Sequence, residues 1–327
     1  MQKLIIFLLL ITFVFGLKVL EHQCGHDKFK QSYKYESIPR DPVEESSDIR
    51  NLQTKQSRNM IITYNMDYFK SLTTDTSGLK NKLISINNSC EKVLQLAIDY
   101  FSRLIKIIPT DMRYKHINKK CGLVPIPQID RIQGKKSDLH LYVSYTFEKN
   151  SNSLAHASWC QFIDYLGPTH GTVNFNLGIL TTKNMEDPII FEDLMEIIIH
   201  EIAHVLGFSD GDANRWVNSD EKHYTNPILK IQIKGIEKQL IKTPNIKKFA
   251  QNYYGCQNLH DILLEDQGGT GSVGSHWEQT VIADEYMNAS ISLNQAYFSG
   301  FTTNLLKDTG FYAEIDESME EKTTYGK

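Results

Sequence analysis

The sequence predicts an α+β protein with an amino-terminal mixed-sheet subdomain, a central helix and a smaller carboxy-terminal subdomain. Three observations predict this class. Residues 90–108 carry apolar side chains at mostly helical spacing and end before Pro109. Residues 139–147 alternate in polarity and are rich in β-formers, while residues 171–176 are a shorter strand candidate. Residues 189–206 are apolar over the length of a core helix.

The composition is that of an ordinary soluble protein. The 327 residues include 35 basic and 39 acidic side chains, and 41% of the residues are hydrophobic. This balance offers neither the basic surplus of a nucleic-acid-binding protein nor a polybasic membrane patch, so we expect no nucleic-acid partner. The length suits one monomeric unit of two subdomains around a cleft.

The chain begins with the pattern of a secretory signal peptide. Residues 1–16 combine a charged start, an apolar run and a small-residue exit, and Lys18 follows closely. The run is shorter than the roughly 20 residues that span a bilayer. The charged tail, residues 313–327, lacks the apolar end of a lipid anchor. We expect a secreted product with no visible anchor, although membrane or cell-surface association stays open. Asn87 and Asn288 begin glycosylation sequons.

Residues 200–204 read HEIAH and predict a metal site within the central helix. His200 and His204 stand four residues apart, so both imidazoles project from one helix face and can reach one tetrahedral zinc ion. Glu201 then lies beside the open coordination position, where a carboxylate can take a proton from zinc-bound water. A chance grouping on a solvated face is the alternative, but the apolar surroundings argue against it.

Three solutions for a third zinc ligand stay open on spacing alone. The compact pattern HExxHxxGxxH is met as far as its glycine, but its last position holds Asp210, whose carboxylate could itself bind zinc. A downstream glutamate, Glu221 or Glu237, is the second solution. The third is His276, in the glycine-rich stretch 265–278. A flexible loop of this kind suits a ligand that returns to a distant helix.

Four short segments resemble the leishmanolysin family of metzincin proteases: residues 254–256, 264–269, 274–276 and 284–287. The resemblance implies a metzincin-type fold in which the central helix is the active-site helix. It also implies a zinc-dependent endopeptidase with one Zn²⁺ per chain and protein or peptide substrates. Its implied site residues are the zinc ligands His200, His204 and His276, the general base and proton donor Glu201, and the Met-turn residue Met287.

The same resemblance implies a substrate-binding strand. In metzincins an edge strand beside the zinc helix pairs with the extended substrate, and strand addition supplies backbone hydrogen bonds whatever the substrate sequence. We expect the strand candidate nearest the helix to take this role. Its residues are Thr172, Val173, Asn174 and Phe175.

Residues 22–27, HQCGHD, resemble the propeptide motif of this family. A thiolate is a good zinc ligand, so Cys24 could fill the open coordination position and keep the protein latent until the segment is cut away. Polar residues without periodicity follow, as in an activation linker. The expected units are a signal peptide (1–16), a propeptide with the cysteine switch (17–58), an amino-terminal catalytic subdomain (59–207), an insertion, third-ligand loop and Met-turn subdomain (208–312) and the charged tail (313–327).

Five cysteines are an odd number for a secreted chain, which favours a free thiol at Cys24. Four cysteines allow three connectivities, between which the sequence cannot choose. As a working expectation we pair Cys90 with Cys121 and Cys160 with Cys256.

A function from another class also fits the sequence. The scaffold could belong to a catalytically inactive, secreted adhesion or binding protein. Glu201 weighs against this reading, because a protein that only bound zinc would not need that carboxylate.

Overall fold

The computed structural model describes most of the chain: residues 22–33, 35–39, 56–74, 80–110, 113–267, 272–290, 295–323 and 326. The predicted signal peptide, most of the expected activation linker and residues 268–271 of the glycine-rich stretch lie outside the described residues.

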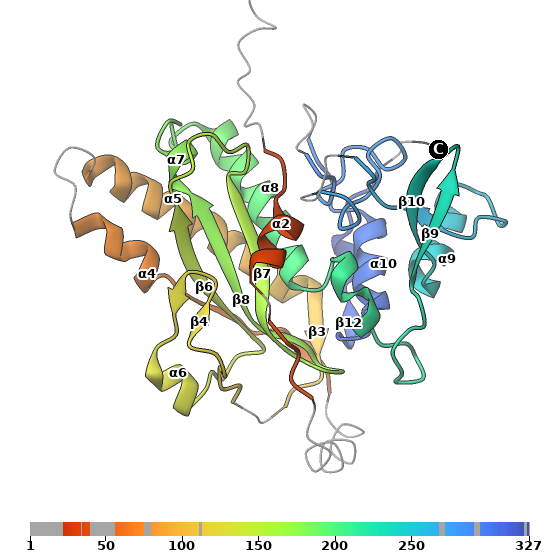
Figure 1. Ribbon diagram of the computed structural model, residues 1–327, viewed down its shortest axis with the longest axis horizontal. Coiled ribbons are helices and arrows are strands. Elements are labelled where there is room, and N and C mark those ends of the chain that lie inside the picture. The colour runs from red at the N-terminus through yellow and green to blue at the C-terminus, as the bar shows by residue number, and fades with distance from the viewer. Residues whose placement is uncertain are drawn as a thin grey trace, which may run out of the picture.

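A four-stranded mixed sheet forms the centre of the amino-terminal part (Figure 1). Its strands are β2 (Ile62–Asn65), β6 (Leu139–Thr146), β8 (Gly167–Asn176) and β7 (Ala155–Ile163), in that spatial order. The first three strands run parallel, and β7 pairs antiparallel with β8 at one edge. The mixed sheet that the sequence predicts is therefore present.

The strand predictions match the structure in two of three long strands. The predicted strand at 139–147 is confirmed as β6, and the candidate at 171–176 is confirmed as β8, which begins four residues earlier. The sequence did not indicate β7. Its side chains are almost all buried, so it lacks the alternation that marks a half-exposed strand.

Two long helices, α5 (Lys80–Leu104) and α8 (Pro188–Val205), pack against each other, and α8 also packs on β7 and β8 (Figure 1). The helix predicted at 90–108 has both ends misplaced, because α5 begins at Lys80 and ends at Leu104. After Leu104 the chain enters β3 (Ile105–Ile107), which pairs with β1 (Arg58–Asn59) and β12 (Glu314–Ile315). The β-branched residues at 105 and 107 suit this pairing, because they favour strands over helices.

The ends of α8 follow local rules. Asp187 caps the amino terminus, since its side chain accepts a hydrogen bond from the backbone N–H of Ile189, and Pro188 occupies the first turn. Gly207 has a φ of 116°, a conformation that side-chain-bearing residues rarely adopt. The chain therefore turns sharply where the sequence predicts the helix to stop.

The carboxy-terminal part holds a three-stranded sheet and two helices. The sheet comprises β9 (Ile228–Ile233), β10 (Ile236–Ile241) and β11 (Ile262–Leu263), and the helices are α9 (Pro244–Tyr253) and α10 (Gly300–Asp308). Asp308 joins the two helices, because its carboxylate accepts hydrogen bonds from Thr243 Oγ1 and from the backbone N–H groups of residues 245 and 246. One continuous apolar core runs through both parts of the chain.

The remaining elements are short. They are α2 (His26–Ser32), α4 (Asp67–Lys70), α6 (Gln128–Ile132), α7 (Leu177–Leu180), β4 (Lys120–Cys121), β5 (Val124–Pro125), and the 3₁₀ turns η1 (Ser71–Thr74), η2 (Asp210–Arg215) and η4 (Glu317–Met319). Among the described residues, no helix combines the length and apolar character needed to cross a bilayer.

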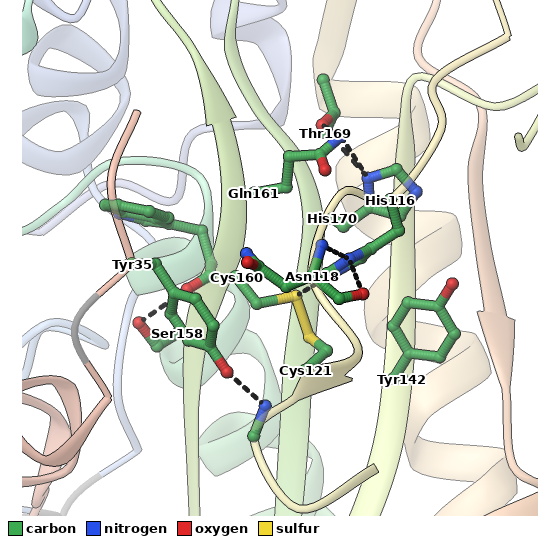
Figure 2. The surroundings of a disulfide bond; sticks show 12 residues. Tyr35, His116, Asn118, Cys121, Tyr142, Ser158, Cys160, Gln161, Thr169 and His170 are labelled. Atoms are coloured by element: carbon green, nitrogen blue, oxygen red, sulfur yellow. Dashed lines mark hydrogen bonds between the residues drawn. A yellow bond between two sulfur atoms is a disulfide. The ribbon is translucent and has the colours of Figure 1, made fainter. Parts of the chain in front are cut away.

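The disulfide pairing expected from the sequence is wrong. Cys121 on β4 bonds to Cys160 on β7, while Cys24, Cys90 and Cys256 are free (Figure 2). Cys90 is buried within α5 and Cys256 is exposed after α9, so neither reaches its expected partner. The β4–β5 hairpin lies against the sheet and brings Cys121 to β7, a contact that spacing along the chain does not reveal.

Both sequon asparagines are buried. Asn87 lies in α5, and the side chain of Asn288 donates a hydrogen bond to the carbonyl oxygen of Ile282 at 2.8 Å. The folded structure therefore presents neither asparagine to solvent.

Three buried histidines surround the disulfide and the adjoining strands. His116 Nε2 lies 3.3 Å from Cys160 Sγ, and His140 Nδ1 lies 2.7 Å from Thr63 Oγ1 (Figure 2 shows His116 and His170). Burial lowers the pKa of His116 to about 4 and that of His140 to about 3, and it lowers the pKa of His170 as well. All three imidazoles are therefore neutral at neutral pH.

We predict that His140→Gln flattens the acid dependence of stability. Unfolding raises the pKa of His140 from about 3 towards 6.5, so the unfolded chain binds the extra proton and the free energy of unfolding falls as pH drops below about 6.5. Without His140 this slope decreases by up to about 1.4 kcal/mol per pH unit. Urea unfolding at pH 4 to 7 measures it. The variant His260→Gln, at an exposed position, is the control, and equal slopes for wild type and His140→Gln would contradict the prediction.

Candidate metal centre

Helix α8 places two imidazoles and a carboxylate on its buried side. His200, Glu201 and His204 are at most 4% exposed. The Nε2 atoms of His200 and His204 lie 3.0 Å apart, as the spacing of four residues predicts.

His276 joins this pair from the distant loop. Its Nε2 lies 3.2 Å from His204 Nε2, and its ring is fully buried. Asp210 is not part of the group of ligand atoms that lie within 4.8 Å of one another. Glu221 and Glu237 are both exposed and are likewise not part of that group. Of the three solutions for a third ligand, the structure brings only His276 to the central helix.

Backbone carbonyls orient all three imidazoles. The Nδ1 atoms of His200, His204 and His276 lie 2.6, 2.7 and 2.8 Å from the carbonyl oxygens of residues 286, 208 and 272, respectively. A carbonyl oxygen only accepts, so each Nδ1 must carry the hydrogen and each Nε2 must present a lone pair. Such outer contacts fix the tautomer and ring orientation of metal-binding histidines.

Cys24 completes a set of four donors. Its Sγ lies 3.4 Å from His204 Nε2, and the four ligand atoms of Cys24, His200, His204 and His276 all fall within 4.8 Å of one another. Three imidazole nitrogens and one thiol sulfur are a donor set that suits tetrahedral zinc. Burial and the nearby Glu201 carboxylate raise the pKa of the Cys24 thiol, so a thiolate here requires a cation beside it. These residues fit a bound metal ion.

Glu201 lies next to these donors, and one of its carboxylate oxygens is fixed by a backbone hydrogen bond. Its Oε2 accepts a hydrogen bond of 2.7 Å from the backbone N–H of Ala157, and its Oε1 lies 3.6 Å from Cys24 Sγ and 3.6 Å from His22 Nε2. Burial raises the pKa of Glu201 to about 7. The second oxygen, Oε1, therefore faces the Cys24 sulfur, beside the three imidazoles.

Met287 lies in a buried turn that supports the centre. Its carbonyl oxygen accepts a hydrogen bond from the N–H of Trp277, the residue after the third histidine. Its own N–H donates to Glu285, whose other oxygen accepts from Ser299 and Thr302 at the start of α10. The turn therefore connects the third-histidine loop to the carboxy-terminal helix.

The segment around Cys24 covers the free edge of the sheet. His26 Nδ1 donates to the carbonyl oxygen of Ala157 at 2.8 Å, and the His26 ring stacks on His204 at 4.1 Å between centroids. The backbone N–H of Gln23 donates to the carbonyl oxygen of Asn152 at 3.1 Å. These contacts run along β7 and its approach, and the ring stacking reaches α8, so the segment lies across the edge of β7 and the buried face of α8.

The strand that we expected to bind the substrate is not at the edge of the sheet. Thr172, Val173, Asn174 and Phe175 lie in β8, between β6 and β7, and both of its edges are paired. A strand with two partners has no free backbone groups for a third. The edge strand beside α8 is β7, where Ala157 has both backbone polar groups turned away from β8.

Glu196, Trp159 and Asp212, which the sequence analysis did not single out, lie around the centre. His22 lines a small cavity beside His200 together with Glu196 and Tyr286. Asp212 and Trp159 bind Lys30 of the segment that carries Cys24. The alternate spacing of His22, Cys24 and His26 was the only visible signal, since nothing local distinguishes Asp212 from other acidic loop residues.

Comparison with known proteins finds the same family that the sequence segments resemble. A family model described as Leishmanolysin matches residues 86–327. A leishmanolysin homolog of Crithidia fasciculata is 27% identical over 275 residues, which cover 82% of this chain and 38% of that protein. Leishmanolysin of Leishmania donovani is 27% identical over 212 residues (64% and 33%), and a leishmanolysin-like peptidase of Caenorhabditis briggsae is 28% identical over 222 residues (57% and 33%). The chain spans about a third of the length of these relatives.

We predict that His276→Ala abolishes tight zinc binding and that Asp210→Ala retains it. Removing a direct ligand should lower zinc affinity by more than about 100-fold, since the loss of an outer contact alone costs about 10- to 100-fold. Metal content after dialysis against a competing chelator measures the difference, and circular dichroism checks that both variants fold. Zinc retained by His276→Ala but lost from Asp210→Ala would show that the ligand set is wrong.

Proposed function

The chain belongs to the leishmanolysin family of peptidases, and from that premise we propose that it is a secreted, zinc-dependent endopeptidase that stays latent until its propeptide is removed. The observation that carries the proposal is the convergence of His200, His204, His276 and Cys24 beside the carboxylate of Glu201. The family consists of zinc enzymes, and this donor set suits one Zn²⁺ per chain.

Each residue of the centre has a distinct role in this proposal. His200, His204 and His276 would hold the zinc ion, which would supply Lewis acidity to the scissile carbonyl and to the attacking water. Glu201 takes a proton from the water that attacks the carbonyl carbon, and later gives a proton to the leaving amine. The N–H of Ala157 keeps Glu201 Oε2 in place, which leaves Oε1 for the proton transfer.

The edge strand β7 binds the substrate backbone. The carbonyl oxygen of Ala157, which accepts from His26 in the latent chain, becomes available to a substrate N–H when the segment leaves. A peptide added to this edge gains backbone hydrogen bonds that do not depend on its sequence. The substrates are therefore proteins or peptides that reach the groove in an extended form.

Cys24 is the latency element. Its sulfur lies among the three imidazoles, where it would exclude the water that the reaction requires. Cleavage after the docked segment, at the end of residues 17–58, removes this ligand. The contacts of Gln23, His26 and Lys30 hold the segment in place until then.

Location and partners follow from the same premise. Residues 1–16 carry the pattern of a secretory signal, so we place the mature protein outside the cell. We propose that it acts as a monomer, with residues 59–207 supplying the helix and edge strand and residues 208–312 supplying the third histidine and Met287.

We predict that Glu201→Gln lowers kcat/KM on an unstructured protein substrate by at least about 100-fold, because the amide cannot accept the proton. Zinc content and the unfolding midpoint should remain those of the wild type. Glu192→Gln, at an exposed position of the same helix, is the matched control and should keep full activity. A zinc chelator should abolish the wild-type activity. A folded, zinc-loaded and processed wild type without activity would instead support an inactive binding protein.

We predict that Cys24→Ser makes the unprocessed chain active. A serine hydroxyl is a much weaker zinc ligand than a thiolate, so water can enter the fourth position. Activity of the intact chain should rise by at least about tenfold, comparable to the effect of a lost metal contact. Cys256→Ser changes the exposed free cysteine and serves as the control that stays latent. Equal latency in the two variants would refute the cysteine switch.

A further inference from the structure

A small lobe of the amino-terminal part has a structure of its own. It comprises residues 113–136, which include β4, β5 and α6, and it lies on the side away from the carboxy-terminal sheet (Figure 1). Its two arms pair through Tyr114 and Lys135, whose backbones exchange hydrogen bonds of 3.1 and 2.9 Å. The disulfide between Cys121 and Cys160 ties the lobe to β7 (Figure 2). We call residues 113–136 the basic lobe.

The basic lobe carries a positive charge that the composition of the whole chain does not reveal. It contains seven basic residues and one acidic residue, whereas the chain has 35 basic and 39 acidic residues. The acidic residue, Asp130, is 3% exposed, and its carboxylate lies 2.9 Å from Lys135 Nζ and accepts a hydrogen bond from the hydroxyl of Tyr142. The exposed side chains of the lobe include six basic ones: Arg113, Lys115, Lys119, Lys120, Arg131 and Lys136.

Three isoleucines are exposed among these charges. Ile117 and Ile132 are 58% and 57% exposed, the highest values for large hydrophobic residues in the part of the chain that the structure describes, and Ile129 is 52% exposed. The backbone N–H of His116 donates to the carbonyl oxygen of Asp130 at 3.3 Å. Each isoleucine is within two residues of this one contact between the arms, so the three side chains belong to one region of the surface.

The core beneath this region has no place for the isoleucines. It is a separate apolar cluster whose members are at most 7% exposed: Cys121, Val124, Ile126, Tyr142 and Cys160. The three exposed side chains therefore keep a large part of their apolar surface in water, which is unfavourable. Exposed apolar groups that are surrounded by charged residues are typical of a contact surface.

We propose that the basic lobe is a membrane-contact surface for a bilayer that contains anionic lipids. The lysine and arginine side chains bind the anionic headgroups, and the three isoleucines enter the interface between headgroups and acyl chains. The proposal does not depend on the proposed peptidase activity. It adds a surface by which a secreted chain binds a membrane without a spanning helix.

The side chains of the lobe favour a bilayer over other anionic partners. Proteins that bind single-stranded nucleic acids stack bases on aromatic rings, but Tyr114 and His116, the residues of the lobe that carry rings, are at most 6% exposed. Protein interfaces are enriched in aromatic residues and depleted in lysine, whereas this surface has four exposed lysines. A sulfated polysaccharide would use the charges and give the isoleucines no role.

Co-sedimentation of the full latent chain with vesicles tests the proposal. The vesicles contain phosphatidylcholine alone or equal amounts of phosphatidylcholine and phosphatidylserine. The wild type should bind the mixed vesicles at least about tenfold more tightly, because each basic residue near an anionic surface contributes about fivefold. Added salt should weaken this binding, because it screens the charges.

Two double variants separate the charges from the apolar contact. Replacement of Lys119 and Lys120 by glutamine should lower the affinity for mixed vesicles by roughly 25-fold, at about fivefold for each lysine. Replacement of Ile129 and Ile132 by serine should lower it by at least about tenfold, since each methylene group lost from an apolar contact costs about fourfold. Circular dichroism and urea unfolding check that both variants fold.

Matched controls change the same residue types on another surface. Ile236→Ser and Lys242→Gln replace exposed residues at the two ends of β10 and should bind mixed vesicles like the wild type. A tryptophan reporter, Ile117→Trp, should shift its emission to shorter wavelength when mixed vesicles are added, because its ring leaves water.

Two results would overturn the proposal. Binding that is lost in the lysine variant but unchanged in the isoleucine variant would show a surface for soluble polyanions. Equal binding by the wild type and both double variants would show that the lobe does not contact the bilayer. None of these measurements requires turnover, so an inactive protein would overturn the peptidase proposal and leave this one to be decided by the vesicles.

Discussion

Three hydrogen bonds from imidazole Nδ1 groups to backbone carbonyls determine the chemistry of this structure. They make the three Nε2 atoms of His200, His204 and His276 converge as lone-pair donors, and without them either tautomer and several ring orientations would be open. The accepting carbonyls come from three segments: the turn at Tyr286, the exit of α8 at Phe208 and the loop at Ser272. The centre is therefore only as well ordered as the backbone of these three segments.

Different local contacts fix the backbone segments that carry these three carbonyl groups. Gly207, with its positive φ, lets the chain turn back so that the carbonyl of Phe208 meets His204. Glu285 ties the turn at 286 and 287 to the first residues of α10. The backbone pairs between Glu265 and His276 and between Trp277 and Met287 join the loop to that turn. Much of the carboxy-terminal part thus serves to position one histidine and one carbonyl.

The segment around Cys24 supplies partners to three polar groups around the metal donors. Cys24 meets the imidazole nitrogens, His26 meets the carbonyl of Ala157, and Lys30 meets Asp212. Buried polar groups that lose a partner carry a desolvation cost. Removal of the segment would therefore leave the imidazole nitrogens, the carbonyl oxygen of Ala157 and the carboxylate of Asp212 without these partners. In the proposed peptidase, the attacking water would replace the Cys24 thiol, and a substrate backbone N–H would replace the His26 ring at the carbonyl oxygen of Ala157. Under the proposed function, latency and substrate binding would therefore use the same polar groups of the site.

The sequence alone determined what depends on neighbours along the chain. The repeat of 3.6 residues places His200 and His204 on one face of a helix, and Asp187, Pro188 and Gly207 mark the ends of that helix. The alternation at 139–147 likewise predicted β6, and the motif around Cys24 indicated a thiol aimed at the metal donors. Family resemblance, not spacing, selected His276 among the candidates for a third ligand.

Only the tertiary structure decided which distant segments meet. It joined Cys121 to Cys160, placed β8 inside the sheet with β7 at its edge, and set Asp212 beneath Lys30. Local patterns report the periodicity and the capping of one element, because those properties arise within a few residues. Contacts between elements arise from how whole faces pack together. The entropic cost of bringing two segments together varies only slowly with the number of residues between them. Spacing along the chain therefore cannot show which of two distant segments a given segment contacts.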